Sequence, residues 1–489
     1  MVFYISLTIV AFFVLWGILS PANLTKTADI LLSIVIEKFG WFYLLTTFSI
    51  LVFSVYLAFS KYGKIRLGSQ EDRPEYSNTS WFAMLLSAGM GIGLVFWGVA
   101  EPIQHYINPP LGIEGSTPEA ALTAMRFAFF HWGLHPWAIY TIIGLCLAYF
   151  NFRKGFSNLI SSTFYPLLKE KVNGPLGHII DILSIIATSF GIATSLGLGA
   201  LQINGGLHAV FGLSNQLTVQ IIIISIVTVL YLLSAITGLD RGIKLLSNIN
   251  IGIAIGLLLF VLFLGPTSSI FDTFTTTLGG YIQNIIQMSL RLTPFTQGVW
   301  IGEWTLFYWS WWIAWAPFVG MFIARVSKGR TIKEFVFGVL LAPSLFSFLW
   351  FSVFGGTALN LVINGQQGIT KAVEADITSA LFITLRKLPL STVVCLLATL
   401  LIITFFITSA DSATFVLGML SSKGDLNPKN RIKIIWGVLQ SAIAIILLLS
   451  GGLQGLQTMA IITALPFAVI LAIMCFSFIK ALRNEGEDD

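Results

Sequence analysis

Charged residues are scarce in this sequence. Asp, Glu, Lys and Arg make up 10% of the 489 residues, whereas 56% are hydrophobic, and the mean hydropathy is +0.87. A soluble protein usually carries about 25% charged residues. The shortage of charge excludes a soluble globular body and indicates a polytopic membrane protein. The net charge of +5 does not indicate a nucleic-acid partner, because basic residues in a membrane protein first report its orientation.

Cysteine is also rare. Cys146, Cys395 and Cys475 each lie inside an apolar run, which predicts buried thiols and neither disulfides nor metal ligands. The sequence also lacks a nucleophile-and-base pair, a glycine-rich phosphate loop and any nucleotide motif. These absences give no support to an enzyme or to an ATP-driven pump, and no cofactor is expected.

Long apolar runs are abundant. Twelve of them can cross about 30 Å of hydrocarbon, and they begin near Val2, Phe42, Trp81, Ala124, Asp181, Thr218, Ser247, Trp300, Phe335, Ser391, Ile432 and Leu456. The first lacks a basic segment before it, so we expect a retained helix and not a cleaved signal. Residues 266–295 mix apolar and polar side chains at helical spacing and predict an amphipathic helix at the membrane interface.

The basic residues are distributed unevenly between the two sets of connecting segments. One alternating set, which includes both termini, holds twenty Lys and Arg residues, and the other holds seven. Cytoplasmic segments of membrane proteins usually carry more Lys and Arg residues than the segments on the opposite side. We therefore expect a multi-pass protein of the plasma or inner membrane with both termini cytoplasmic, the C-terminal one being a short tail over residues 481–489.

The third apolar run contains SAGMGIGLVFWGVAEP, in which Gly89, Gly91 and Gly93 alternate. Glycines at this spacing suit close packing between helices. They also suit a helix that unwinds and exposes its carbonyls. Pro102 follows shortly after, and this favours the broken helix, which in membrane proteins usually lines a substrate or ion site.

Tryptophan is concentrated in FYWSWWIAWAPFVGM, residues 307–321, with four indoles between positions 309 and 315. At about 100° per residue a single stripe of this helix presents Tyr308, Trp311, Trp312 and Trp315. The segment FFHWGLHPWAIY offers a second stripe with Trp132, Trp137 and Tyr140. Two such stripes form a box of ring faces, which binds a quaternary ammonium group by cation–π attraction. The alternative is an interfacial aromatic belt, but Trp137 and Trp315 lie near the middle of their runs.

Few other residues carry chemistry. Glu101 and Asp411 are intramembrane carboxylates, which either function in transport or neutralise a basic partner. His131 and His135 have a metal-ligand spacing without an evident third ligand, so a metal centre is not favoured. Adjacent hydroxyls on Thr408 and Ser409 suit sodium, a hard cation that prefers oxygen. Alternatively, they bond back to their own helix.

The segments GMGIGLVFWGVAEP, FFHWGLHPWAIY and FYWSWWIAWAPFVGMFIARVSKGRTIKEF resemble the betaine/carnitine/choline transporter family. The resemblance runs from about Phe42 to the end of the chain. It implies an all-α polytopic membrane protein of twelve transmembrane helices, with two extra helices in residues 1–60 before a leucine-transporter-type inverted repeat. The two five-helix halves would occupy residues 80–265 and 298–480, with Pro317 interrupting the eighth span. Members of the family are typically homotrimers.

The resemblance also implies roles for individual residues. The central box would consist of Trp132, Trp137, Tyr140 and Trp312, and the access paths would hold Trp311 and Trp315. The backbone at Gly89 and Met90 would lie beside the ligand carboxylate. One sodium ion would bind Ser87, Met90, Phe405, Thr408 and Ser409. A second, weaker sodium site would use Thr188 and Phe318, but its second threonine is replaced by Ile192.

The glycine motif narrows the choice of substrate. Choline carriers of this kind often carry aspartate where this chain has Gly93, and a zwitterion such as glycine betaine needs no such counter-charge. We expect a sodium-coupled symporter that takes up glycine betaine as an osmoprotectant, surrounded by membrane lipid. Choline or carnitine transport of the same family is the alternative. A cation channel is disfavoured because no ring of carboxylates lines a continuous polar path.

Overall fold

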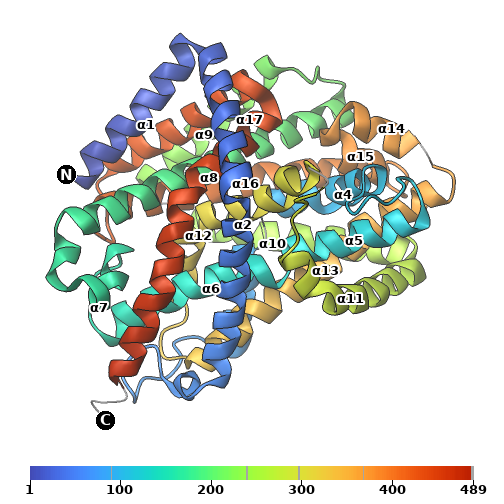
Figure 1. Cartoon of the computed structure of the whole chain (residues 1–489). Helices are drawn as coiled ribbons and strands as arrows, with labels where there is room; N and C mark the ends of the chain where they lie inside the picture. The colour runs from blue at the N-terminus through green and yellow to red at the C-terminus, as the bar shows by residue number, and fades with distance from the viewer. Residues whose placement is uncertain (90, 238–239, 296–297, 367, 486–489) are drawn as a thin grey trace.

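The computed structural model describes residues 1–89, 91–237, 240–295, 298–366 and 368–485, and this part of the chain consists of helices joined by short connecting segments (Figure 1). Within it no β-strand forms, and Arg66 and Thr331 make an isolated bridge. The helices are α1 (Val2–Leu19), α2 (Pro21–Phe59), α3 (Asn78–Gly89), α4 (Ile92–Ile107), α5 (Pro118–Trp132), α6 (Leu134–Ala148), α7 (Tyr165–Leu168), α8 (Pro175–Phe211), α9 (Leu217–Thr237), α10 (Asp240–Leu264), α11 (Thr267–Ser289), α12 (Phe307–Arg325), α13 (Ile332–Ile363), α14 (Gly368–Ala375), α15 (Ala380–Leu385), α16 (Ser391–Ser421) and α17 (Asn430–Glu485).

The number of helices that can cross a membrane agrees with the sequence. By length and composition ten described segments qualify, and the bent pair α3–α4 adds an eleventh. The segment α17 is itself two helices joined at Gly452, whose φ of 55° and ψ of −135° are not helical. Counting its two halves separately gives the twelve predicted spans and confirms an all-α polytopic membrane protein. The helix α17 continues to Glu485, beyond the point where we expected a tail to begin.

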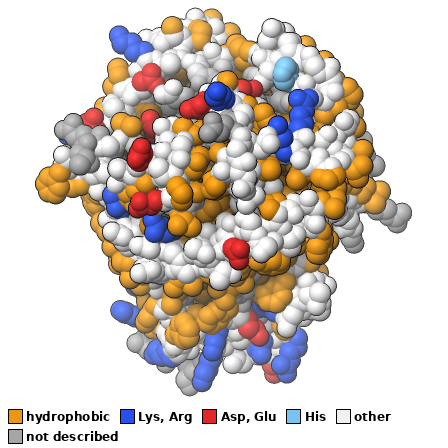
Figure 2. Space-filling model, turned by 90° about the vertical axis from the view of Figure 1, so that its right-hand side faces the viewer, with side chains coloured by type: hydrophobic (Ala, Val, Ile, Leu, Met, Phe, Trp, Pro, Cys, Tyr) orange, Lys and Arg blue, Asp and Glu red, His pale blue; other side chains and the backbone are white. Residues whose placement is uncertain are grey.

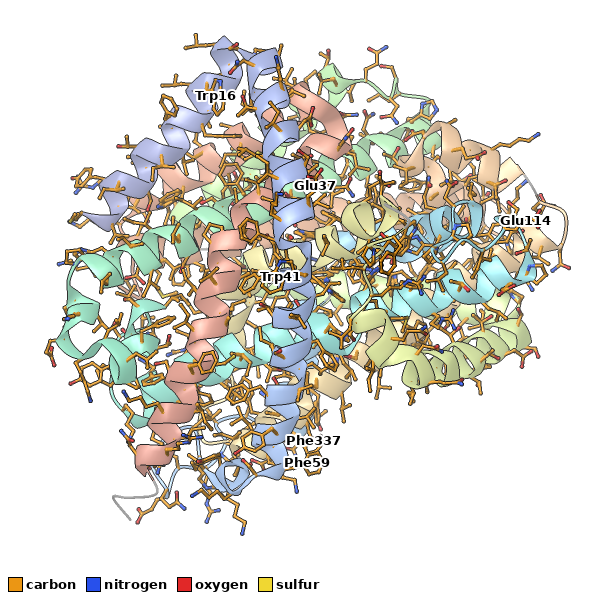
Figure 3. The ribbon with its side chains drawn as sticks, viewed as in Figure 1. Trp16, Glu37, Trp41, Phe59, Glu114 and Phe337 are labelled. Atoms are coloured by element: carbon orange, nitrogen blue, oxygen red, sulfur yellow. The ribbon has the colours of Figure 1, made fainter. Side chains whose placement is uncertain are left out.

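The first two helices, α1 and α2, pack against helices from the rest of the chain. Trp16 near the end of α1 donates to the Asn23 side chain at 3.0 Å, across the turn into α2. The long helix α2 packs along α17, where the Tyr43 hydroxyl donates to the carbonyl of Ile461 at 2.6 Å. At its far end Phe59 meets Phe337 of α13 edge to face, with ring centroids 5.5 Å apart (Figure 3).

Two spans break where the sequence carries glycine. The helices α3 and α4 meet at an angle of 65°, and Gly91 between them is fully extended. The fourth span divides into α5 and α6 at Gly133, which has φ −94° and ψ −132°. The stripe expected from one regular helix there is therefore wrong in detail, because Trp132 lies before the break and Trp137 after it.

The eighth span differs from expectation in the opposite way. We predicted that Pro317 interrupts it, yet α12 runs without a break from Phe307 to Arg325, with Pro317 inside. A proline removes one backbone hydrogen bond, and a helix packed against neighbours tolerates that loss. The irregular turn lies earlier, in a π-helical turn over Gly302–Leu306.

The surface fits a protein embedded in lipid. On the face shown in Figure 2, charged side chains gather in the upper part and at the lower end, and a band between them carries mainly hydrophobic and uncharged side chains. The helix α11 lies on the outside of the molecule against α5 and α13 (Figure 1). It occupies most of the segment that we expected to be an amphipathic connector.

Candidate functional site: an aromatic cavity among the broken helices

A cavity of about 750 Å³ lies among α4, α5, α6, α12 and α16, within the size range of small-molecule sites. The rings predicted for the central box all line it: Trp132, Trp137, Tyr140 and Trp312. The rings predicted for the access paths, Trp311 and Trp315, line it as well. The structure therefore brings these six rings together around one cavity.

The rings form a compact box. Trp132 meets Trp312 edge to face with centroids 4.8 Å apart, and Tyr140 meets Trp312 in the same way at 6.3 Å. Trp137 and Tyr140 are 5.4 Å apart, and Trp311 stacks on Trp312 at 4.9 Å. Perpendicular rings present more than one face to the same space, which is the arrangement that attracts a cation lacking N–H donors.

Three of the four indoles of α12 donate to acceptors on other helices. Trp311 donates to the Ser195 hydroxyl at 3.1 Å, and Trp315 donates to the carbonyl of Gly191 at 2.9 Å. Trp312 donates to the carbonyl of His131 at 3.0 Å, just before the helix break at Gly133. Each ring is thus oriented by one hydrogen bond, and the break in the fourth span supplies one of the acceptors.

Gly93 is required by these rings. A Cβ atom at this position would lie 2.4 Å from Cη2 of Trp311 and 3.2 Å from Cη2 of Trp132, well inside ordinary carbon–carbon contact. In the sequence, Gly93 indicated close helix packing or an unwound helix, and a zwitterionic substrate. The structure adds a steric reason, since the indoles occupy the space that a side chain needs.

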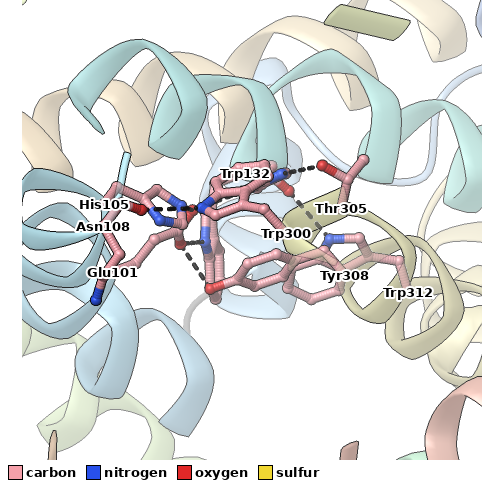
Figure 4. A network of polar contacts seen from close by, with 9 residues as sticks. Glu101, His105, Asn108, Trp132, Trp300, Thr305, Tyr308 and Trp312 are labelled. Carbon is pink, nitrogen blue, oxygen red and sulfur yellow. Dashed lines mark hydrogen bonds and ion pairs between the residues drawn. The ribbon is translucent and has the colours of Figure 1, made fainter. Parts of the chain in front are cut away.

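Tyr308 does not belong to the cavity, although the helical stripe placed it there. It is fully buried, and its hydroxyl donates to Oε2 of Glu101 at 2.6 Å. Glu101 also accepts from Nε1 of Trp132 at 2.8 Å. A polar network therefore lies behind the box (Figure 4).

The two histidines of the fourth span do not share a partner. His131 contacts Glu101 at 2.7 Å, and His135 contacts Ser289 of α11 at 2.8 Å. Candidate ligand atoms of Glu101, His105 and His131 lie within 4.8 Å of one another. His131 and His105 each direct the nearer ring nitrogen at Glu101, so the cluster is a hydrogen-bonded network as it stands.

Four of the five residues predicted for the first sodium site line the same cavity: Ser87, Phe405, Thr408 and Ser409. Met90 lies outside the described residues, and Gly89 is the last residue of α3. The Thr408 hydroxyl donates to the carbonyl of Thr404 at 3.0 Å. It accepts from the Asn250 amide at 3.3 Å, a contact from α10 that the sequence did not indicate.

The residues predicted for the second ion are less favourably placed. Phe318 lines the cavity, but Thr188 is fully buried and absent from the described lining. Its hydroxyl donates to the carbonyl of Ser184, one turn earlier in α8, at 2.7 Å. Ile192 is buried beside it and offers no oxygen. Thr188 and Thr408 both donate to a carbonyl of their own helix, which was the alternative explanation given for Thr408 and Ser409.

The cavity also reaches helix ends near the basic segments. Asn151 beyond α6, Arg325 at the end of α12 and Lys433 at the start of α17 all contribute to its lining. Asp411 lines it as well. We did not predict from the sequence that these residues, or Ser195 and Asn250, line the cavity, because that depends on which helices meet in the fold.

Comparison with known proteins agrees with this geometry. The sequence model of the betaine/carnitine/choline family of transporters matches residues 1–487. The chain is 53% identical to the glycine betaine transporter OpuD of Bacillus subtilis (strain 168), with 100% of this chain and 95% of that protein covered. It is 47% identical to a probable glycine betaine transporter of Desulfitobacterium hafniense (strain Y51), over 99% of this chain and 97% of that protein. It is 49% identical to the ectoine/hydroxyectoine transporter of Virgibacillus pantothenticus, over the same shares of the two chains. The chain belongs to the betaine/carnitine/choline family of transporters.

Proposed function

We propose that the protein takes up glycine betaine together with sodium. The observation that carries this proposal is the box of four rings around one end of the cavity. A quaternary ammonium group cannot be held by donated hydrogen bonds, and each desolvated ring contact contributes about 0.5–2 kcal/mol. Two of the relatives named above are described as glycine betaine transporters, one of them as probable.

Glycine betaine is proposed as the substrate in preference to choline because it carries a carboxylate as well as the ammonium group. The broken ends of α3 and α4 lie beside the box, and the N-terminus of a helix such as α4 favours a carboxylate. Glycine betaine has one and choline does not. Ectoine is also a zwitterion, and one relative is described as a transporter of ectoine and hydroxyectoine, so ectoine belongs among the competitors in any test.

Coupling to sodium is proposed through the first site only. Ser87, Phe405, Thr408 and Ser409 line the cavity, and the ligands of this site would be the carbonyls of the first two and the hydroxyls of the last two. Oxygen atoms at an unwound helix are suitable ligands for a hard cation. A second ion has weak support, because Thr188 is outside the described lining of the cavity and Ile192 offers no oxygen.

The same proposal covers orientation and assembly. Both termini are cytoplasmic, by the bias of Lys and Arg, and the cavity lining at Arg325 and Lys433 then corresponds to a conformation that faces the cytoplasm. Residues 80–265 and 298–480 are the two inverted repeats, and the protein assembles as a homotrimer. Cysteine labelling from each side of the membrane tests the orientation, and light scattering in detergent tests the assembly.

The deciding experiment is uptake of labelled glycine betaine into proteoliposomes. We expect saturable uptake that an inward sodium gradient drives, with unlabelled choline, carnitine and ectoine competing less well than betaine. Preference for one of the competitors would reassign the substrate. Uptake that does not saturate would indicate a channel. Because betaine carries no net charge, the reversal potential counts the sodium ions, and two charges per betaine would contradict the single-site proposal.

A further inference from the structure

Glu101 is fully buried in α4 and does not belong to the described lining of the cavity. Its carboxylate nevertheless takes part in four hydrogen bonds (Figure 4). Oε2 accepts from Nε1 of Trp132 at 2.8 Å and from the Tyr308 hydroxyl at 2.6 Å. Oε1 contacts Nδ1 of His131 at 2.7 Å and Nε2 of His105 at 3.2 Å. A carboxylate surrounded by four donors is stabilised in its charged form.

Neutral forms of the two histidines satisfy the hydrogen-bond pattern around Glu101. His131 directs Nδ1 at Glu101, and its Nε2 lies 3.0 Å from the Thr305 hydroxyl, which can donate to it. His105 directs Nε2 at Glu101, and its Nδ1 has no hydrogen-bond partner among the described atoms. Both imidazoles therefore fit as neutral donors. No Lys or Arg of the described chain forms an ion pair with Glu101, whose partners of this kind are His105 and His131; with both imidazoles neutral, the carboxylate has no counter-charge behind the box.

This charge connects to the box through the ring of Trp132. Trp132 lines the cavity with its ring and gives its N–H to Glu101. Donation to an anion polarises the donor, because hydrogen bonds in series reinforce one another in a low dielectric. An indole polarised in this way carries more negative charge on its faces, and cation–π attraction grows with that charge.

We propose that Glu101 is a positioning residue that makes the box selective for a positively charged headgroup over a neutral group of the same shape. It acts through the indole of Trp132 and does not touch the substrate. The proposal rests on the proposed function, since it concerns the same cavity and the same quaternary ammonium ligand.

A carbon isostere separates charge from shape. In 3,3-dimethylbutanoate the trimethylammonium group of glycine betaine is replaced by tert-butyl, which has nearly the same size but no charge. The quantity to measure is the ratio of the two dissociation constants, isostere over betaine, by calorimetry in detergent at saturating sodium. We expect Glu101→Gln to lower this ratio about tenfold, which corresponds to ~1.4 kcal/mol, mostly through weaker betaine binding. Equal losses for both ligands would overturn the proposal, because they would show that Glu101 only supports the structure.

Two further variants keep the test decisive. Glu101→Asp keeps the charge, so we expect its ratio to stay near that of the unmodified protein even if both affinities fall. If Glu101→Gln does not fold, Trp132→Phe retains a ring but loses the hydrogen bond to Glu101. Trp137→Phe is its matched control, since Trp137 lines the same box and no hydrogen bond joins it to Glu101 in the described structure. A larger fall of the ratio for Trp132→Phe supports the proposal, and equal falls contradict it.

The outcomes also separate this proposal from the proposed function. If the unmodified protein does not bind glycine betaine, the assignment of the substrate fails. If it binds betaine more tightly than the isostere and Glu101→Gln leaves the ratio unchanged, the substrate stands and the role of Glu101 is refuted.

Discussion

A single methyl group at Gly93 tests whether the packing of the indoles determines affinity. In Gly93→Ala the new Cβ would lie 2.4 Å from Cη2 of Trp311. Non-bonded carbons prefer separations of about 3.5–4.0 Å, so the indole must withdraw by roughly 1 Å. The ring cannot do so freely, because it stacks on Trp312 at 4.9 Å and on Phe307 at 5.6 Å. Its N–H also holds the Ser195 hydroxyl at 3.1 Å.

The size of the effect follows from these contacts. Inserting a methyl group into a well-packed site costs about 1–3 kcal/mol. Because Trp311 stacks on Trp312 of the box, a displaced Trp311 distorts the space around the ammonium group. We therefore expect the affinity for glycine betaine to fall by at least about tenfold, which is ~1.4 kcal/mol, in a protein that still folds. Calorimetry in detergent measures the affinity, and thermal unfolding reports the fold.

Two comparisons make the result interpretable. Gly256→Ala in α10 is the matched control, since a Cβ there meets no atom within 4 Å, and its affinity should not change. In a Trp311→Phe background the smaller ring leaves space for the methyl group, so Gly93→Ala should cost less than in the unmodified protein. Unchanged affinity in Gly93→Ala, or the same cost in both backgrounds, would refute the steric explanation.

Three further changes follow from the same structure. Trp312→Leu should weaken betaine binding about tenfold or more by calorimetry, because leucine offers no ring face; unchanged affinity in a folded variant would place the ligand elsewhere. Thr408→Ala combined with Ser409→Ala should abolish the stimulation of betaine uptake by sodium, and retained stimulation would move the ion to another site. Gly452→Ala should lower the free energy of unfolding by about 1–3 kcal/mol, because its φ is 55°. Gly451→Ala is the control, as neither Cβ meets an atom within 4 Å; equal stabilities in thermal unfolding would contradict the reasoning.

Much of the architecture could be predicted because it depends on local composition. A run of apolar residues long enough to span a bilayer has to satisfy its own backbone hydrogen bonds, and a helix does so within one segment. The twelve runs therefore appear as helices. The aromatic box could also be predicted, since segments rich in aromatic residues can be recognised in the sequence without knowledge of the fold. The error at Pro317 shows the limit of this reasoning, because neighbouring helices decide whether a proline breaks a span.

The sequence by itself determined the class of the protein, its helical spans and the aromatic residues that line the cavity. Only the tertiary structure decided which hydrogen-bond partners orient those side chains. The partner of Trp311 is Ser195, 116 positions away, and the indole of Trp132 meets Glu101 on another helix. The Thr188 hydroxyl donates to a carbonyl of its own helix, and the absence of a side chain at Gly93 leaves space for the indole of Trp311. Such contacts depend on which distant helices touch, and no local pattern of side chains contains that information.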